Sequence, residues 1–217
     1  MVIKNNSDGK PYFSQRNNKI KPASSCNVTS IINALSSAGW PVQQMAPAGI
    51  QPEDSLMHFI MTDASCGRKW RSLDPEGKIP PNEWHAVLAY GANKWLAKLG
   101  YTGSPVQFRE NVTAEEIKAV IQDGGAAVVS GYFPSVDGML NHVVAIVGYS
   151  GDDFIIDDPW GDFRDKYVTV KGNDIPMKRA EFISFLKPLG NMKKWAHLVK
   201  QNPYVVKKES KTDILSV

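Results

Sequence analysis

The chain has 217 residues, of which 42% are hydrophobic and 22% charged, as is typical of a soluble globular protein with one large domain and a substantial core. Lys and Arg outnumber Asp and Glu by only 25 to 22, which is too small a surplus to indicate a nucleic-acid partner. No stretch is long and apolar enough to predict a transmembrane helix.

The two ends of the chain are polar. Residues 1–10 lack the apolar stretch of a secretory signal, which predicts a protein that is cytoplasmic at synthesis. Residues 201–217 are predicted to form a polar, lysine-rich tail. Six lysines and one acidic residue, Glu209, lie between positions 193 and 211. A solvated end is the favoured interpretation, and attraction to an anionic surface stays open.

Two cysteines are present, Cys26 and Cys66. They are too few for a disulfide scaffold, and neither belongs to a Cys-x-x-Cys pair, so a thiolate zinc site is not expected. A single bridge between them is left open by the sequence.

In chain order, the first predicted element is a short strand or an extended lead-in over residues 11–15, followed by a polar turn at 16–19. Pro22 keeps the chain non-helical as far as the pair Ser24-Ser25. From Cys26 onward the apolar positions follow helical spacing, which predicts an amphipathic helix of about three turns ending near Gly39. These apolar positions are Val28, Ile31, Ile32 and Leu35.

Residues 39–110 are predicted to be a helical insertion or subdomain within a single domain of residues 1–200. This region contains a short helix over 53–62, a loop around Cys66, and a longer helix that follows Pro80-Pro81 and ends before Gly100. Thr113 and Glu116 then form a capping box, which predicts a helix as far as Gln122.

After Gly124-Gly125 the pattern changes from helix to strand. Strands are predicted over 126–130, 142–149, 153–157, 167–170 and 195–199, with a turn at 150–152 and a helix over 177–186. Helices therefore come first and an antiparallel sheet second, which predicts an α+β fold rather than a doubly wound parallel sheet.

Cys26 lies where the first helix begins, directly after Ser25, whose hydroxyl is a candidate helix cap. Free amide groups and the helix dipole at this end favour an anion, so a thiol there is biased toward the nucleophilic thiolate. The alternative for Cys26 is a buried cysteine that acts as a small apolar residue.

The hairpin that turns at 150–152 supplies a partner for this cysteine. His142 and a residue at about 158–160 lie at equal distances from the turn, and opposed side chains in a hairpin share a face. Asp158 fits that position, whereas Asp157 should point to the other face. A cysteine, a histidine and an aspartate that orients the histidine form the arrangement of acyl-transfer catalysis. The backbone amide of Cys26 and the side chain of Gln15 are candidate oxyanion donors.

Other candidate residues carry weaker predictions. Trp160 and Asn141 adjoin Asp158 and His142 and are candidates for substrate binding. A dyad of Cys66 with His85 lacks an evident orienting group. No cofactor or metal is expected, because the aspartates of the second half match no EF-hand spacing. These are Asp152, Asp153, Asp157, Asp158 and Asp162. His58 and His197 lie in apolar stretches and are expected to be packed side chains rather than ligands.

At these residues the sequence resembles the C39-like branch of the papain-like cysteine peptidases. Three segments carry the resemblance. The first is Tyr-Phe-Ser-Gln at 12–15 leading to Ser-Cys-Asn-Val-Thr-Ser at 25–30. The second runs from Gly-Gly-Ala-Ala-Val-Val at 124–129 to Asn-His-Val-Val-Ala-Ile-Val-Gly-Tyr at 141–149. The third is Phe-Ile-Ile-Asp-Asp-Pro-Trp-Gly at 154–161.

The resemblance implies a papain-like α+β fold, with an N-terminal nucleophile helix packed on a C-terminal antiparallel sheet. It implies Cys26 as nucleophile, His142 as general base and acid, Asp158 as the orienting group and Gln15 as oxyanion donor. Two departures leave the substrate class open. Asn27 follows the cysteine where Cys-Gly-Pro-Thr is more familiar, and Asn141 precedes the histidine where glycine is common.

The resulting hypothesis is a monomeric thiol hydrolase that cuts peptide or amide bonds. Relatives of this type include peptidases that cut leader peptides after double glycine, and stand-alone proteins that look like cell-wall hydrolases of bacteria and phages. Peptidoglycan stem peptides are the first candidate substrate, as for a phage endolysin acting on the cell wall. The alternatives are an intracellular peptidase that processes a leader or precursor, and a catalytically silent binding module on the same fold.

Overall fold

A computed structural model describes residues 3–186 and 194–204. Most of the predicted tail, residues 205–217, lies outside the described residues, as do Lys193, Lys207, Lys208 and Lys211. None of the helices within 3–186 and 194–204 combines the length and hydrophobicity that crossing a membrane requires.

Most strands of the antiparallel sheet come from the second half of the chain. The hydrogen-bonded order of the sheet is β2-β7-β3-β4-β5-β6, and β1 pairs with the C-terminal end of β4, from Gly148 to Ser150. This confirms the prediction of an α+β fold with an antiparallel sheet. The strands are β1 (Ile3–Asn5), β2 (Val106–Glu110), β3 (Ala126–Ser135), β4 (Gly138–Ser150), β5 (Asp153–Asp157), β6 (Ile175–Met177) and β7 (Trp195–Val199).

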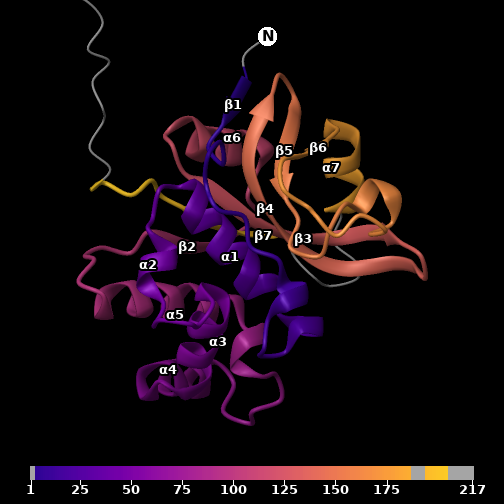
Figure 1. Cartoon of the computed structure of the whole chain (residues 1–217). Coiled ribbons are helices and arrows are strands. Elements are labelled where there is room, and N and C mark those ends of the chain that lie inside the picture. The colour runs from indigo at the N-terminus through magenta and orange to yellow at the C-terminus, as the bar shows by residue number, and fades with distance from the viewer. Residues whose placement is uncertain (1–2, 187–193, 205–217) are drawn as a thin grey trace, which may run out of the picture.

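Helices cover both faces of this sheet (Figure 1). Helices α1, α3 and α5 pack on one face, and α6 and α7 pack on the other. In Figure 1, α3, α4 and α5 gather below α1, at a distance from the twisted end of the sheet. The helices are α1 (Cys26–Ser37), α2 (Val42–Met45), α3 (Pro52–Thr62), α4 (Ala64–Leu73), α5 (His85–Lys98), α6 (Ala114–Gln122) and α7 (Arg179–Phe185).

The central strand β4 shows why both faces of the sheet are apolar. Val143, Ala145 and Val147 pack among the residues of α1, α3 and α5. Val144 and Ile146, which alternate with them, pack on the α6 and α7 side. Successive side chains of a strand point to opposite faces, so a strand covered on both faces must be apolar throughout.

Helix α1 is buried from Asn27 to Ser37 and carries three polar side chains that fix its position. Ser30 Oγ donates to the Val143 carbonyl at 2.8 Å, beside His142 on β4. Asn33 accepts from the Phe13 amide at 2.8 Å and donates to its carbonyl at 2.9 Å, and Ser36 Oγ donates to the Pro11 carbonyl at 2.8 Å. Because buried polar groups require partners, α1 is held in one register against β4 and the lead-in to Gln15.

The structure differs from the sequence predictions in several elements. The loop predicted at Cys66 lies inside α4, where the Asp63 side chain caps the helix by accepting from the amides of Ser65 and Cys66. The strand predicted at 167–170 does not form, since Lys166 and Tyr167 both adopt positive φ, 59° and 68°. Strands β1, β2 and β6 and the short helix α2 were not expected. Each of these strands is short and is stabilised by pairing with a segment outside its own neighbourhood in sequence.

Candidate active site

Cys26 is the first residue of α1, with a half-buried free thiol. Ser25 occupies the cap position, but the prediction that its hydroxyl caps the helix is wrong, because that side chain makes no capping bond. Instead Ser25 Oγ and Thr29 Oγ1 both contact the Asn18 side-chain amide, at 2.8 and 3.0 Å. The two hydroxyls donate to Asn18 Oδ1 when the side-chain oxygen and nitrogen of Asn18 are exchanged, and Asn18 Nδ2 then donates to Glu53 Oε1. The Val28 amide donates to Asn27 Oδ1 at 2.7 Å. The amides of Cys26 and Asn27 are therefore the first-turn donors that remain for a ligand at the thiol.

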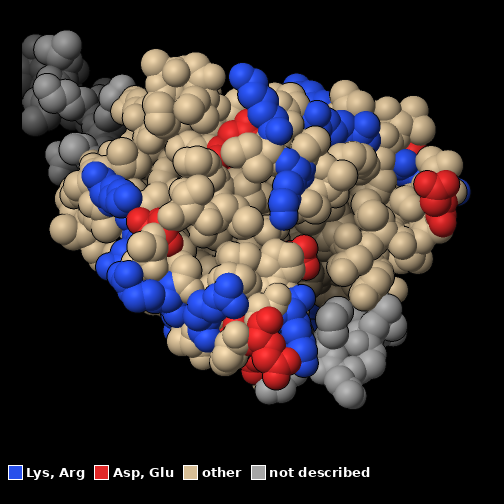
Figure 2. Space-filling view, turned by 90° about the horizontal axis from the view of Figure 1, so that it is seen from below, with Lys and Arg blue, Asp and Glu red and all other residues tan. Residues whose placement is uncertain are grey.

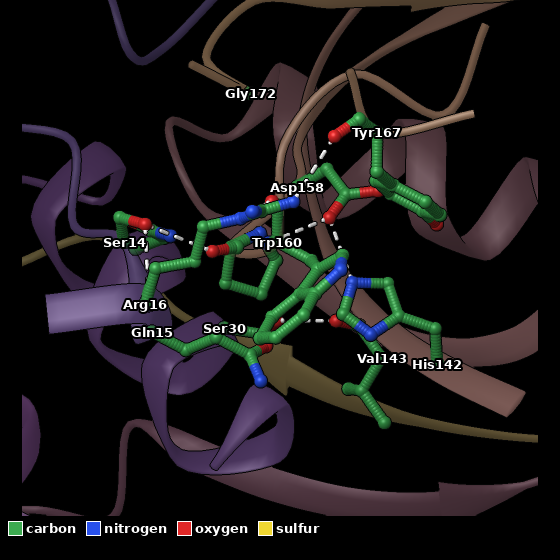
Figure 3. A network of polar contacts seen from close by, with 12 residues as sticks. Ser14, Gln15, Arg16, Ser30, His142, Val143, Asp158, Trp160, Tyr167 and Gly172 are labelled. Carbon is green, nitrogen blue, oxygen red and sulfur yellow. Dashed lines mark hydrogen bonds and ion pairs between the residues drawn. The ribbon is translucent and has the colours of Figure 1, made fainter. Parts of the chain in front are cut away.

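His142 and Asp158 meet as the hairpin predicts, with His142 Nε2 at 2.7 Å from Asp158 Oδ1 (Figure 3). The route differs in detail. A bulge at Val147 shifts the register, so the last residue of β5, Asp157, lies opposite Ala145. Asp158 therefore reaches His142 from the turn after β5 rather than from a paired position.

The His142 imidazole is almost completely buried. Burial alone would lower its pKa, but the Asp158 carboxylate and a hydrogen bond with the Cys26 side chain raise the pKa to about 10. Because Nε2 is taken by Asp158, Nδ1 is the ring nitrogen left for Cys26. The three residues thus form a chain from Cys26 through His142 to Asp158.

The backbone of Asp158 is held as firmly as its side chain. Its amide donates to the Gly172 carbonyl at 2.7 Å, and its carbonyl accepts from the Tyr12 hydroxyl at 2.6 Å. The Gly172 amide also donates to the Tyr12 oxygen. A side chain at Gly172 would collide with the Asp158 carbonyl, so this position requires glycine. Asp157 points elsewhere, as predicted, and accepts from the Asp174 amide.

The segment with Gln15 and the turn with Trp160 are tied together (Figure 3). The backbone amide of Gln15 donates to the Pro159 carbonyl at 3.0 Å. Arg16 Nε donates to the Trp160 carbonyl at 2.5 Å, and its guanidinium lies 4.4 Å from the centre of the Trp160 ring. Gln15 Nε2 donates to the Pro22 carbonyl at 2.8 Å, which leaves its second hydrogen free.

A cleft of about 550 Å³ opens beside Cys26. Asn141 lines it, as do Val143 and Trp195 from the sheet, and Trp84 and His85 from the helical region. Trp160 is not one of its lining residues. In Figure 3 its ring lies between Gln15 and the His142–Asp158 pair. The roles predicted for Asn141 and Trp160 in substrate binding stay predictions.

The structure does not bring the rival dyad together. Cys66 is fully buried against Gly91 of α5, and burial raises the pKa of its thiol to about 11. His85 lies six residues from Gly91 on the same helix, about 9 Å along its axis, and its ring stacks on Trp195. Both cysteines are free, so the bridge that the sequence left open is absent.

The remaining candidates have other partners. Asp152, Asp153 and Asp162 pair with basic side chains, and the described residues contain no cluster of three or more His, Cys, Asp or Glu suited to a metal ion. His197 is buried, as predicted, whereas His58 is exposed on α3, so the prediction that its side chain is packed is wrong. Helical periodicity places His58 on the outer face, which its apolar neighbours in sequence concealed.

Sequence reasoning missed several residues that hold the site together. Tyr12, Arg16 and Gly172 bind Asp158 and the turn after it. Ser30 and Asn33 were detectable, since polar residues on the buried side of an otherwise apolar helix indicate specific partners. The partners themselves lie more than a hundred residues away for Ser30 and twenty away for Asn33.

Comparisons with known proteins agree with this geometry. The model of a family described as the Peptidase_C39 like family matches residues 8–184. A crystal structure described as a C39-like peptidase from Bacillus anthracis is similar in fold, with a TM-score of 0.54 at 17% sequence identity, over 92% of this chain and 98% of that one. No curated protein matches the chain.

Proposed function

The chain belongs to the Peptidase_C39 like family, and on this premise we propose that it is a cysteine peptidase with Cys26, His142 and Asp158 as its catalytic residues. One observation carries the proposal. Buried His142 contacts Asp158 through Nε2 and makes a second hydrogen bond, with the side chain of Cys26 at the start of α1. This is the nucleophile, base and orienting group that acyl transfer requires.

In the first half of the reaction, Cys26 Sγ attacks the carbonyl carbon of the peptide bond while His142 Nδ1 holds the thiol proton. The tetrahedral intermediate collapses as His142 gives that proton to the leaving nitrogen, so the C–N bond breaks, the amine departs and a thioester remains on Cys26. His142 then takes a proton from water, whose oxygen attacks the thioester. The acid is released, and the proton returns to Cys26.

Two donors support the oxyanion of each tetrahedral intermediate. The Cys26 amide is the first of α1, a position at which an amide has no backbone acceptor within the helix. Gln15 Nε2 retains one free hydrogen beyond its bond to Pro22. Together they would bind a developing negative charge from fixed positions.

Labelling and activity test the proposal together. Iodoacetamide at pH 7 should modify one thiol in the native protein, and Cys26→Ala should abolish both that modification and peptide cleavage, by at least about a thousandfold. Cys66→Ala is the matched control, because that thiol is buried away from the cleft. Peptide cleavage that survives in Cys26→Ala contradicts the proposal, and a native protein without any cleavage supports the silent binding module instead.

Peptidoglycan stem peptides remain the substrate proposed from the sequence, with a leader or precursor protein as the alternative. The support for a wall substrate is the resemblance to stand-alone wall hydrolases and the lysine-rich end of the sequence. Figure 2 shows Lys and Arg spread over one face of the molecule with Asp and Glu between them. Mass analysis of fragments released from purified walls and from candidate precursors, with Cys26→Ala as control, separates the two substrates.

A further inference from the structure

The cleft beside Cys26 joins parts of the chain that are far apart in sequence. Ile79, Trp84 and His85 come from the helical region of residues 39–110, Val143 comes from β4, and Trp195 comes from β7. Cys26 itself lines the same space. A peptide whose carbonyl carbon reaches the thiol must therefore place a neighbouring side chain in or against this cleft.

Three rings, those of Trp84, His85 and Trp195, form much of the wall of the cleft. The His85 ring stacks on Trp195 with 3.6 Å between ring centres, and it stacks on Phe108 at 5.9 Å. Burial lowers the pKa of His85 to about 4, so its imidazole is neutral at pH 7. Glu83, which is exposed, is the one acidic residue among the described residues that line the cleft.

We propose that this cleft is a specificity subsite that takes a bulky apolar or aromatic side chain of the peptide, next to the bond that Cys26 attacks. The inference rests on the proposed peptidase function and names its substrate class. Aromatic walls bind apolar and aromatic groups through buried area and ring stacking. Small or charged side chains gain little there. Of the two candidate substrates, the subsite therefore favours the alternative, a leader or precursor protein.

A role in specificity follows for the helical region. Ile79 is 42% exposed and lines the cleft. Its amide donates to Asp74 Oδ2 and its carbonyl accepts from Trp70 Nε1, so a change of side chain leaves these backbone bonds in place. Ile79 can therefore be altered without disturbing the fold.

The test is a library of synthetic peptides that differ at one position at a time, with cleavage followed by mass spectrometry. At one position, phenylalanine, tryptophan or leucine should raise kcat/KM over alanine by about tenfold or more. Ile79→Glu should reduce this preference at least about fivefold. Ile3→Glu is the matched control, because Ile3 is also exposed but pairs with Ser150, the far end of β4. An unchanged preference in Ile79→Glu, or a preference for alanine, overturns the inference.

A binding measurement separates this inference from the proposed function. Titration calorimetry on Cys26→Ala should show that the best apolar peptide binds about tenfold more tightly than its alanine counterpart. Equal binding overturns the subsite even if cleavage depends on Cys26. Conversely, cleavage that persists in Cys26→Ala removes the proposed mechanism and leaves the binding ratio to be judged by itself.

Discussion

At the scale of single residues, the site depends on a buried charge that is fixed in place. Asp158 Oδ1 accepts from His142 and from the Trp160 amide, at 2.7 and 2.9 Å. Its backbone is bound to Gly172 and Tyr12. A carboxylate that cannot turn away keeps His142 protonated to high pH, and it keeps the ring aimed at Cys26.

Replacing Asp158 by asparagine tests this account through the pH dependence of activity. The negative charge of Asp158 favours the protonated imidazole, so its loss lowers the pKa of His142 from about 10. The alkaline limb of the kcat/KM profile should then move down by at least about one pH unit, and the maximum should fall about a hundredfold or more.

Asp157→Asn is the control for that experiment. Asp157 is the adjacent carboxylate, but its Oδ1 accepts from the Asp174 amide, a bond that asparagine can keep. Its profile should retain the alkaline limb of the parent. If both variants shift the limb equally, the local charge of Asp158 does not set the pKa of His142.

At the scale of elements, polar side chains set the position of α1 against the rest of the chain. Asn33 binds both backbone groups of Phe13, two residues before Gln15. Asn93 does the same for Val106, joining α5 to β2. The two asparagines make matching pairs of bonds, but only the first supports the segment that carries Gln15.

The pair predicts a separation of stability from catalysis. Asn33→Ala and Asn93→Ala should each lower the free energy of unfolding by about 2 to 4 kcal/mol, because each leaves one backbone donor and one acceptor without a partner. Urea unfolding measures this loss. Only Asn33→Ala should also lower kcat, about tenfold or more, in assays at a temperature where both variants are folded. A parallel fall of kcat in both variants contradicts a positioning role for Asn33.

At the scale of the whole molecule, the helical region is joined to the N-terminal segment through buried acids on α3. Asp54 accepts from the amides of Lys19 and Ile20, both at 2.9 Å. Glu53 is buried beside it, and burial raises the pKa of Glu53 to about 7. Above that pH the folded protein holds a buried negative charge, whereas the carboxylate is hydrated in the unfolded chain. The free energy of unfolding is therefore lower at high pH.

Glu53→Gln should therefore stabilise the protein at high pH only. The folded-state pKa of Glu53 exceeds its ordinary value of 4.5, so its favourable contribution is complete below about pH 4.5 and is lost as pH rises through 7. In urea unfolding, the free energy of unfolding of the variant should exceed that of the parent by about 3 kcal/mol at pH 8 and match it at pH 4.5. Glu76→Gln, at an exposed residue, should match the parent at both values. A gain that is equal at both pH values contradicts the buried charge.

Local signals allowed much of the fold to be predicted. The capping box of Thr113 and Glu116 forms as expected, and α1 begins at Cys26 as its apolar spacing predicted. The hairpin of β4 and β5 follows from apolar strands on each side of a glycine turn. In each case the residues that decide the structure lie close together in sequence, so their spacing is enough to predict it.

The sequence by itself determined the candidate triad, because its residues belong to two local structures. Cys26 lies at a helix start, and the positions of His142 and Asp158 relative to the hairpin turn predict that they meet. The tertiary structure alone decided the rest. The Ser25 hydroxyl binds Asn18 instead of capping α1. Residues 167–170 do not form a strand, because Tyr167 has a positive φ. The cleft is lined by Trp84 and His85 from the helical region and by Trp195 from the sheet. These features depend on side chains that meet across long stretches of chain, where hydrogen-bond demand and packing override local preference.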